Sequence, residues 1–276
     1  MRYLSRIGFS LGLGLLVSGG LAGPAQAAEP VTLTYTGYMA GLPVFSLTAT
    51  VELPAGQGSE AGAELVPGNG RYSLNADAAT TGNFRFLYPY RATMVSTGNL
   101  AGATAAPKQF RSVADIVGKQ EAVTLTYGKG GNVAIEAVPM TRQAQEAKAR
   151  GFAHGTIDPA SAVVAAVASF ADTHQCSGTY KLFDGVRRYD LTLAQGGFAD
   201  VAPLAQSYYE GSATECVATS TLLEGFAPAA AQSQFYPRSA RLFMAPAVPG
   251  LPSLPVRIEA QNALGVMTLD LTGVQF

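Results

Sequence analysis

An Asp184-Gly185 pair between two β-prone runs is the feature that most constrains how this chain can fold. Such a pair predicts a two-residue type I′ hairpin, because both central residues of that turn need positive φ. Phe183 is then expected to pair with Val186, which places apolar and polar side chains on opposite faces. The expected apolar face carries Gly178, Tyr180, Leu182, Tyr189, Leu191 and Leu193, and the polar face carries Thr179, Lys181, Arg188, Asp190 and Thr192. The hairpin therefore predicts an antiparallel sheet that is buried on one side and faces water on the other.

Strand signals recur along most of the chain. Alternating β-prone runs, separated by Gly and Pro, predict strands at 31–38, 44–53, 71–79, 83–95, 109–115, 121–127, 132–138, 238–245, 256–261 and 265–274. Four prolines within residues 246–255 exclude that stretch from a central strand. The pattern predicts a mainly β fold, either a large curved antiparallel sheet or an open barrel, built as a single domain over residues 28–276.

Two short helices interrupt this pattern, at about 141–150 and 159–170. Residues 141–150 are good helix formers followed by Gly151, a usual residue after a helix end. Asp158 and Pro159 suit the N-cap and the first position of the second helix. Its expected apolar stripe consists of Val163, Val164, Val167 and Phe170. A helix this rich in alanine can pack closely against a sheet or plug the end of a half-barrel.

Residues 1–27 have the three parts of a secretory signal peptide. Arg2 and Arg6 form a positive region, residues 7–21 form an apolar core, and residues 25–27 read Ala-Gln-Ala, a cleavage site. We expect cleavage after Ala27 and a periplasmic protein that begins at residue 28. Removal of Arg2 and Arg6 from 18 basic residues leaves 16 against 19 acidic ones, a net charge of −3. The Lys and Arg residues form no cluster beyond pairs, so nucleic acid is not an expected partner.

The two cysteines, Cys176 and Cys216, both follow the predicted cleavage site. In an exported protein such a pair most simply forms one disulfide, and two free thiols are the alternative. A bond that closes a loop of this length would stabilise the fold by roughly 4 kcal/mol.

Candidate catalytic and metal-binding groups are sparse. The only histidines, His154 and His174, lack a partner at metal-ligand spacing, so no metal and no cofactor is expected. Ser161, Asp158 and His154 can be drawn as a catalytic triad. Ser161 also stands three residues after the capping Asp158, which gives it a structural explanation. A hydrolase is therefore one alternative function, and no catalytic residue is assigned.

Four aromatic residues alternate along the strand predicted at 83–95. Phe84, Phe86, Tyr88 and Tyr90 would share one face of that strand and form a wide apolar wall. They are the candidate ligand-binding residues. This wall either lines a cavity for an apolar ligand or forms part of the filled core.

A series of short motifs also runs along the chain in a fixed order. They are Tyr35 with Ala40-Gly41, Tyr72 with Thr81-Gly82, Ser96-Thr97-Gly98, Pro107 with Phe110, Asp158-Pro159 with Ser161, Asp184-Gly185 with Arg188-Tyr189, Cys216, and Leu254-Pro255-Val256-Arg257. In this order they resemble the bacterial envelope family catalogued as domain of unknown function 3108, over about residues 31–276. The resemblance implies an exported, mostly β protein of unassigned activity and transfers no catalytic residues.

These observations favour a non-enzymatic periplasmic protein that binds or carries an apolar, lipid-like small molecule. An envelope scaffold that binds another protein is the second hypothesis. The chain is not expected to be integral to the membrane, because the residues that share parity with Phe276 form a poor lipid-facing row. That row consists of Val274, Thr272, Asp270 and Thr268.

Overall fold

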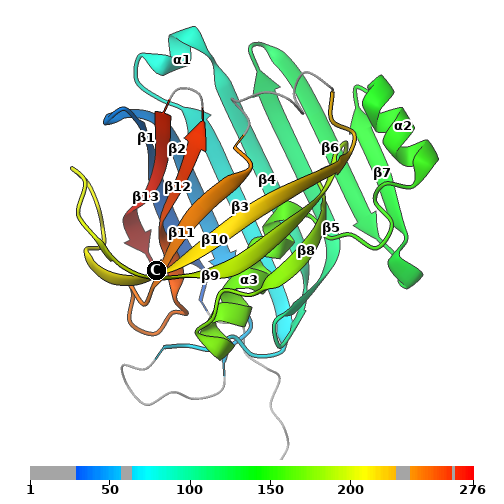
Figure 1. Cartoon of the computed structure of the whole chain (residues 1–276). Helices are drawn as coiled ribbons and strands as arrows, with labels where there is room; N and C mark the ends of the chain where they lie inside the picture. Colours follow the sequence, from blue (N-terminus) through cyan, green and yellow to red (C-terminus); the bar gives the residue numbers. More distant parts are fainter. Residues whose placement is uncertain (1–28, 57–63, 228–236, 263–264) are drawn as a thin grey trace, which may run out of the picture.

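The computed structural model describes residues 29–56, 64–227, 237–262 and 265–276. The predicted signal peptide, residues 1–27, lies outside the described residues. The described part confirms the mainly β prediction, since thirteen antiparallel strands form one strongly curved sheet that does not close into a barrel (Figure 1). β7 and β8 form the two edges of this sheet.

The strands form two meanders. The N-terminal meander consists of β1 (Val31–Met39), β2 (Leu42–Glu52), β3 (Gly70–Thr80), β4 (Tyr90–Ala101), β5 (Thr104–Ile116), β6 (Lys119–Tyr127) and β7 (Val133–Val138). The C-terminal meander consists of β8 (Gly178–Phe183), β9 (Arg188–Val201), β10 (Gly211–Glu224), β11 (Ser239–Ala245), β12 (Leu254–Asn262) and β13 (Gly265–Gln275). The helical segments are α1 (Phe84–Leu87), η1 (Lys129–Gly131), α2 (Arg142–Arg150) and α3 (Pro159–Thr173).

The first and last strands join the two meanders. β1 pairs with β13 in antiparallel fashion, from Thr32 opposite Gln275 to Met39 opposite Met267. The strand order therefore runs β7-β6-β5-β4-β3-β2-β1-β13-β12-β11-β10-β9-β8. The segment that holds α2 and α3 connects one edge of the sheet to the other.

Both predicted helices are present, and Gly151 and Asp158 hold the predicted positions at their ends. The Thr141 side chain accepts a hydrogen bond from Ala144 N at the start of α2, and Gly151 ends that helix in the left-handed conformation. Asp158 caps α3, and its side chain accepts from Ser161 N. α3 continues three residues beyond the predicted end at 170, to Thr173.

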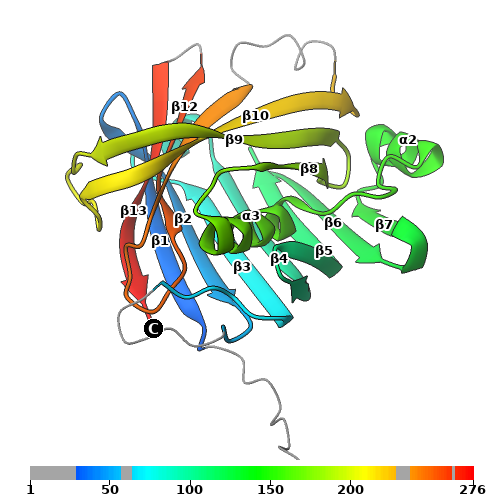
Figure 2. The ribbon, with the colours of Figure 1, turned by 60° about the horizontal axis from the view of Figure 1, so that its bottom comes forward.

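α3 lies within the concavity of the sheet, between β8 and β9 on one side and β3 to β5 on the other (Figure 2). It contacts β3, β4, β5 and β8. The helix residues in the core beneath it are Ala160, Val164, Ala165 and Ala168. Their small side chains let the helix backbone approach the sheet closely, as the sequence predicted for an alanine-rich helix.

In the β8–β9 hairpin the residues that pair differ from the prediction, but the side chains lie on the predicted faces of the sheet. Phe183 pairs with Arg188 rather than with Val186, so residues 184–187 form a longer turn than the predicted one. The Asp184 carboxylate accepts hydrogen bonds from Val186 N at 3.0 Å and Arg187 N at 2.7 Å, which stabilises the longer turn. A shift of two residues keeps every side chain on its predicted face.

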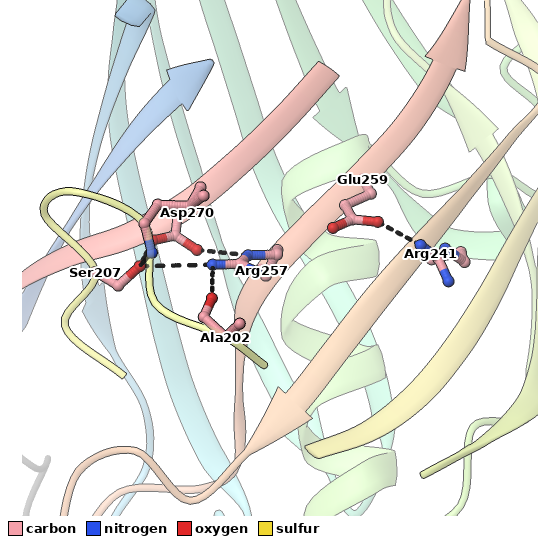
Figure 3. A network of polar contacts seen from close by, with 7 residues as sticks. Ala202, Ser207, Arg241, Arg257, Glu259 and Asp270 are labelled. Carbon is pink, nitrogen blue, oxygen red and sulfur yellow. Dashed lines mark hydrogen bonds and ion pairs between the residues drawn. The ribbon is translucent and has the colours of Figure 1, made fainter. Parts of the chain in front are cut away.

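A buried ion pair holds the β9–β10 connection against the outer face of the sheet. Arg257 Nε on β12 donates to Asp270 Oδ1 on β13 at 2.7 Å, and both side chains are at most 9% exposed (Figure 3). Arg257 Nη2 also donates to Ala202 O at 2.9 Å, and the Ser207 hydroxyl donates to Asp270. These bonds hold the β9–β10 connection against the outer face of β12 and β13.

The exclusion of residues 246–255 from a central strand is wrong at its last two residues. β12 begins at Leu254, and Pro255 pairs with Met244 of β11. The register shifts between Phe243 and Met244, so the proline stands at an irregularity near the strand start, where its missing N–H is tolerated.

Gly185 is expected to be essential for the close approach of the hairpin turn to β6. Its φ is +108°, and a Cβ atom there would lie 2.3 Å from Val123 Cγ1. Gly265 has a similar φ of +117° but open space around its Cβ position. Gly185→Ala should therefore lower the free energy of unfolding by about 1 to 3 kcal/mol more than Gly265→Ala, as measured by urea denaturation. Equal losses in the two variants would mean that only backbone strain, and no clash with Val123, limits this position.

Candidate functional site

A cavity of about 630 Å³ lies between α3 and the concave face of the sheet. Both meanders contribute to it, and almost all of its lining is apolar. From the N-terminal meander the lining includes Val31, Leu33, Tyr35, Leu47, Ala49, Val51, Leu74, Ala76 and Met94. From the C-terminal meander it includes Leu182, Tyr189, Leu191, Leu193, Leu242, Met244, Leu254, Ile258 and Leu269.

Strand register explains why these side chains meet. Leu33 pairs with Ala49, and Ala49 pairs with Ala76, so the three form one inward row across β1, β2 and β3. On the other side, Leu269 pairs with Ile258, and Ile258 pairs with Leu242. Cross-strand partners project from the same face of a sheet, so both rows point into the concavity. The alanines in the first row leave space that larger side chains would fill.

α3 forms the remaining wall of the cavity. Val163 and Val164 both line the cavity, but Val163 is 49% exposed, whereas Val164 is 2% exposed and packs in the core. The lining residues of α3 extend from Pro159 to Phe170, which corresponds to about 16 Å along the helix axis. The cavity therefore runs along most of the length of α3.

Polar groups are few in the lining of the cavity. Glu29 precedes β1, and Gln175 and Ser177 follow the C-terminus of α3; all three line the cavity and are exposed. Burial raises the pKa of the Tyr35 phenol above its ordinary value. The lining therefore combines a large apolar area with a few polar groups, of which these three are exposed.

A buried polar cluster lies under the N-terminus of α3. The Asp158 carboxylate accepts hydrogen bonds from Ser161 N at 2.9 Å, from the Ser161 hydroxyl at 2.5 Å and from the Ser96 hydroxyl at 3.2 Å. The Tyr72 hydroxyl and Ser161 Oγ are 2.7 Å apart. Burial raises the pKa of the Asp158 carboxyl, although the hydrogen bonds from Ser161 and Ser96 act in the opposite direction.

This cluster tests the hydrolase hypothesis, because it contains Ser161 and Asp158 of the possible triad. Ser161 is fully buried, and its side-chain contacts are with Asp158, Ser96 and Tyr72. His154 is exposed, and no hydrogen bond found among the described residues joins it to Ser161. The three residues do not form a triad in this structure, and Ser161 is inaccessible to a substrate.

The four candidate aromatics do not form a wall. Residues 84–87 form α1, so the predicted strand at 83–95 is wrong before Tyr90. The turn at Gly82, with φ +57°, ends β3 and starts this single-turn helix. Phe86 is 73% and Tyr88 46% exposed, Phe84 and Tyr90 are partly buried, and none of the four lines the cavity.

The predicted disulfide is present. Cys176 and Cys216 are bonded, with their Cα atoms 5.4 Å apart. The bond ties the segment that follows α3 to β10, and both cysteines line the cavity. It therefore fixes one end of α3 relative to the C-terminal meander.

Two features are absent among the residues that the structure describes. No three His, Cys, Asp or Glu side chains gather there in a way that could hold a metal ion. Within the same ranges, no helix has the length and hydrophobicity needed to cross a bilayer.

The family model described as "Protein of unknown function (DUF3108)" matches residues 34–272. The chain belongs to the DUF3108 family. The match extends from β1 to β13 and so includes both meanders and α3. No curated protein shows significant sequence similarity to this DUF3108 chain.

Two solved structures are similar to it at low identity. One is a beta-barrel-like protein of the domain of unknown function DUF1849 from Brucella abortus, 11% identical, with 89% of this chain and 97% of that chain covered and a TM-score of 0.44. The other, from Parabacteroides distasonis, is described as a candidate lipoprotein; it is 9% identical, with 90% and 96% covered and a TM-score of 0.34. Neither similarity assigns an activity to the DUF3108 chain.

Sequence reasoning identified some of the cavity wall and missed the rest. The one-sided pattern of the β8–β9 hairpin indicated an inward face, and Leu182, Leu191 and Leu193 of that face line the cavity. The contribution of β2, β3 and β12 was missed. Its signal was the inward alternation of small and aliphatic residues, such as Ala49 and Val51, which is weaker than a row of aromatics.

Replacement of Asp158 by Asn is expected to change how stability depends on pH. A carboxyl whose folded pKa is raised contributes stability that is fully present below its unfolded pKa of about 3.9 and is lost as pH rises through the folded pKa. Asn keeps an acceptor for the helix cap but does not titrate. The free energy of unfolding of the wild type, minus that of Asp158→Asn, should therefore fall as pH rises from 4 towards 8 in urea denaturation. A difference that stays constant or grows with pH would contradict a raised pKa at Asp158.

Proposed function

We propose that this DUF3108 protein is a non-enzymatic periplasmic protein that holds an elongated apolar ligand, such as a lipid acyl chain, in the cavity beside α3. The observation that carries the proposal is a cavity of about 630 Å³ with an almost entirely apolar lining. Cavities of this volume are typical of small-molecule sites, whereas protein cores are normally packed without such space. The length of the cavity along α3 favours a chain-like ligand over a compact one.

The area that a ligand would bury sets the expected scale of affinity. An acyl chain that buries about 200 to 300 Å² of its surface gains roughly 5 to 8 kcal/mol before the costs of association. The apolar lining supplies this gain without directional bonds, so it selects for hydrophobicity more than for a particular chain. The exposed lining residues Glu29, Gln175 and Ser177 would remain available to a polar headgroup.

Export is supported by two features. Residues 1–27 have the pattern of a cleaved signal peptide, and the Cys176–Cys216 disulfide is typical of an oxidising compartment. An apolar ligand in such a compartment has to be shielded from water between membranes. The cavity provides that shielding without a catalytic group.

Val163→Trp tests the cavity directly. The Val163 side chain lines the cavity and is 49% exposed, so a larger side chain can occupy the cavity instead of overpacking the core. The affinity for a fluorescent fatty acid should fall at least about tenfold, while the free energy of unfolding changes by less than about 1 kcal/mol. Fluorescence titration and urea denaturation measure the two quantities.

Val266→Trp is the matched control. Val266 is 48% exposed, lies on β13 with the parity of the outward Asp270, and does not line the cavity. This variant should bind the probe as the wild type does. A wild type that takes up no probe, or a Val163→Trp variant that binds it normally, would refute the proposed site.

A further inference from the structure

Exposed apolar side chains gather at one end of the N-terminal meander. They stand on the β1–β2 turn, the β3–β4 connection that contains α1, and the β5–β6 turn, which are neighbours because β1 to β6 are consecutive in the sheet. We call residues 40–43, 81–91 and 115–120 the α1 end; α1 projects at the upper edge of the sheet in Figure 1. Its exposed apolar residues are Leu42 (66%), Phe86 (73%), Leu87 (81%), Tyr88 (46%) and Val117 (55%).

Backbone hydrogen bonds connect the three parts of the α1 end. Thr81 N donates to Val44 O at 3.0 Å, which ties the β3–β4 connection to β2. Val117 N donates to Pro89 O at 2.9 Å, which ties the β5–β6 turn to the same connection. The Thr80 hydroxyl donates to Tyr88 O at 2.9 Å. The exposed side chains are therefore presented together by a bonded framework.

The α1 end is basic although the whole chain is not. Its charged residues are Arg85, Arg91, Lys119 and Asp115, a net charge of 3 − 1 = +2, whereas the chain carries −1. The Arg85 guanidinium lies 4.8 Å from the centre of the Phe86 ring, so a cation and an aromatic side chain are exposed at the same point.

We propose that the α1 end docks on the surface of an anionic lipid bilayer. Leucine and aromatic side chains that insert at the level of the headgroups, together with basic residues that pair with lipid phosphates, are the combination that binds such surfaces. The excess of basic residues at the α1 end favours an anionic surface, and a bilayer requires no shape complementarity, unlike the interface with a folded protein partner. The proposal does not depend on the cavity, because none of the five exposed residues lines it.

Vesicle co-sedimentation of the full chain tests the proposal. The wild type should bind vesicles that contain phosphatidylglycerol more tightly than vesicles of phosphatidylcholine alone, and added salt should weaken the binding. Phe86→Ser combined with Leu87→Ser should weaken binding at least about tenfold. Arg85→Gln and Arg91→Gln should each weaken it roughly fivefold.

Phe198→Ser is the control for exposed aromatics. Phe198 is 84% exposed on β9, toward the opposite end of the sheet, and its replacement should leave vesicle binding unchanged. Val163→Trp should also bind vesicles normally, because it changes only the cavity. Absence of wild-type binding at low salt, or an equal loss in Phe198→Ser, would overturn the proposal.

The sequence contains no tryptophan, so one introduced residue can report its own surroundings. Emission from Leu87→Trp should shift to the blue on addition of phosphatidylglycerol vesicles and be quenched by brominated lipid, whereas Phe198→Trp should do neither. A blue shift of Leu87→Trp that follows protein concentration in the absence of lipid would assign the α1 end to self-association and overturn lipid docking.

Discussion

The pairing of β1 with β13 is the constraint on which the rest of the structure depends. It is the ladder that joins the two meanders into one sheet. Side chains reinforce it, since the Thr36 and Thr272 hydroxyls lie 3.2 Å apart and Thr272 Oγ1 donates to Thr34 O. Because the cavity draws its walls from both meanders, an opening of this ladder would remove the cavity along with the sheet.

α3 packs closely against one side of the concave face and leaves space on the other side. α3 packs against β3 to β5 through small side chains. Alanines at 160, 165 and 168 bring the helix close on that side and leave Val163 facing open space on the other. The polar bonds of Asp158 and the disulfide at Cys176 hold the two ends of α3, so the helix cannot collapse into the cavity without breaking them.

Much of the local structure could be predicted because its signals are local. Asp158-Pro159 predicted the start of α3, Gly151 predicted the end of α2, and the period of two predicted the faces of the hairpin. The length of the hairpin turn could not be predicted, because it depends on which amides the Asp184 carboxylate reaches. The strand predicted through the aromatic residues near residue 86 was wrong for a related reason. Period two does not distinguish a strand from a turn that carries aromatic residues, and the turn at Gly82 ended the strand first.

The sequence predicted that the site would be apolar, but not which residues would line it. The one-sided apolar pattern of the hairpin predicted an apolar interior. The two halves of the wall, however, are joined by pairing between residues more than 230 positions apart, as in Thr34 and Gly273. No local pattern encodes such a pairing. The residues that line the cavity could therefore be recognised as inward-facing, but not as neighbours.

The position of β13 has a consequence for the order in which the protein folds. The N-terminal meander can form before β13 is in place, and until then the outer edge of β1 stays unpaired. An unpaired β1 presents a row of free backbone donors and acceptors to any other copy of the chain. β13 (Gly265–Gln275) therefore protects β1 against strand exchange between copies, and proteolytic loss of β13 would expose an edge that can template aggregation.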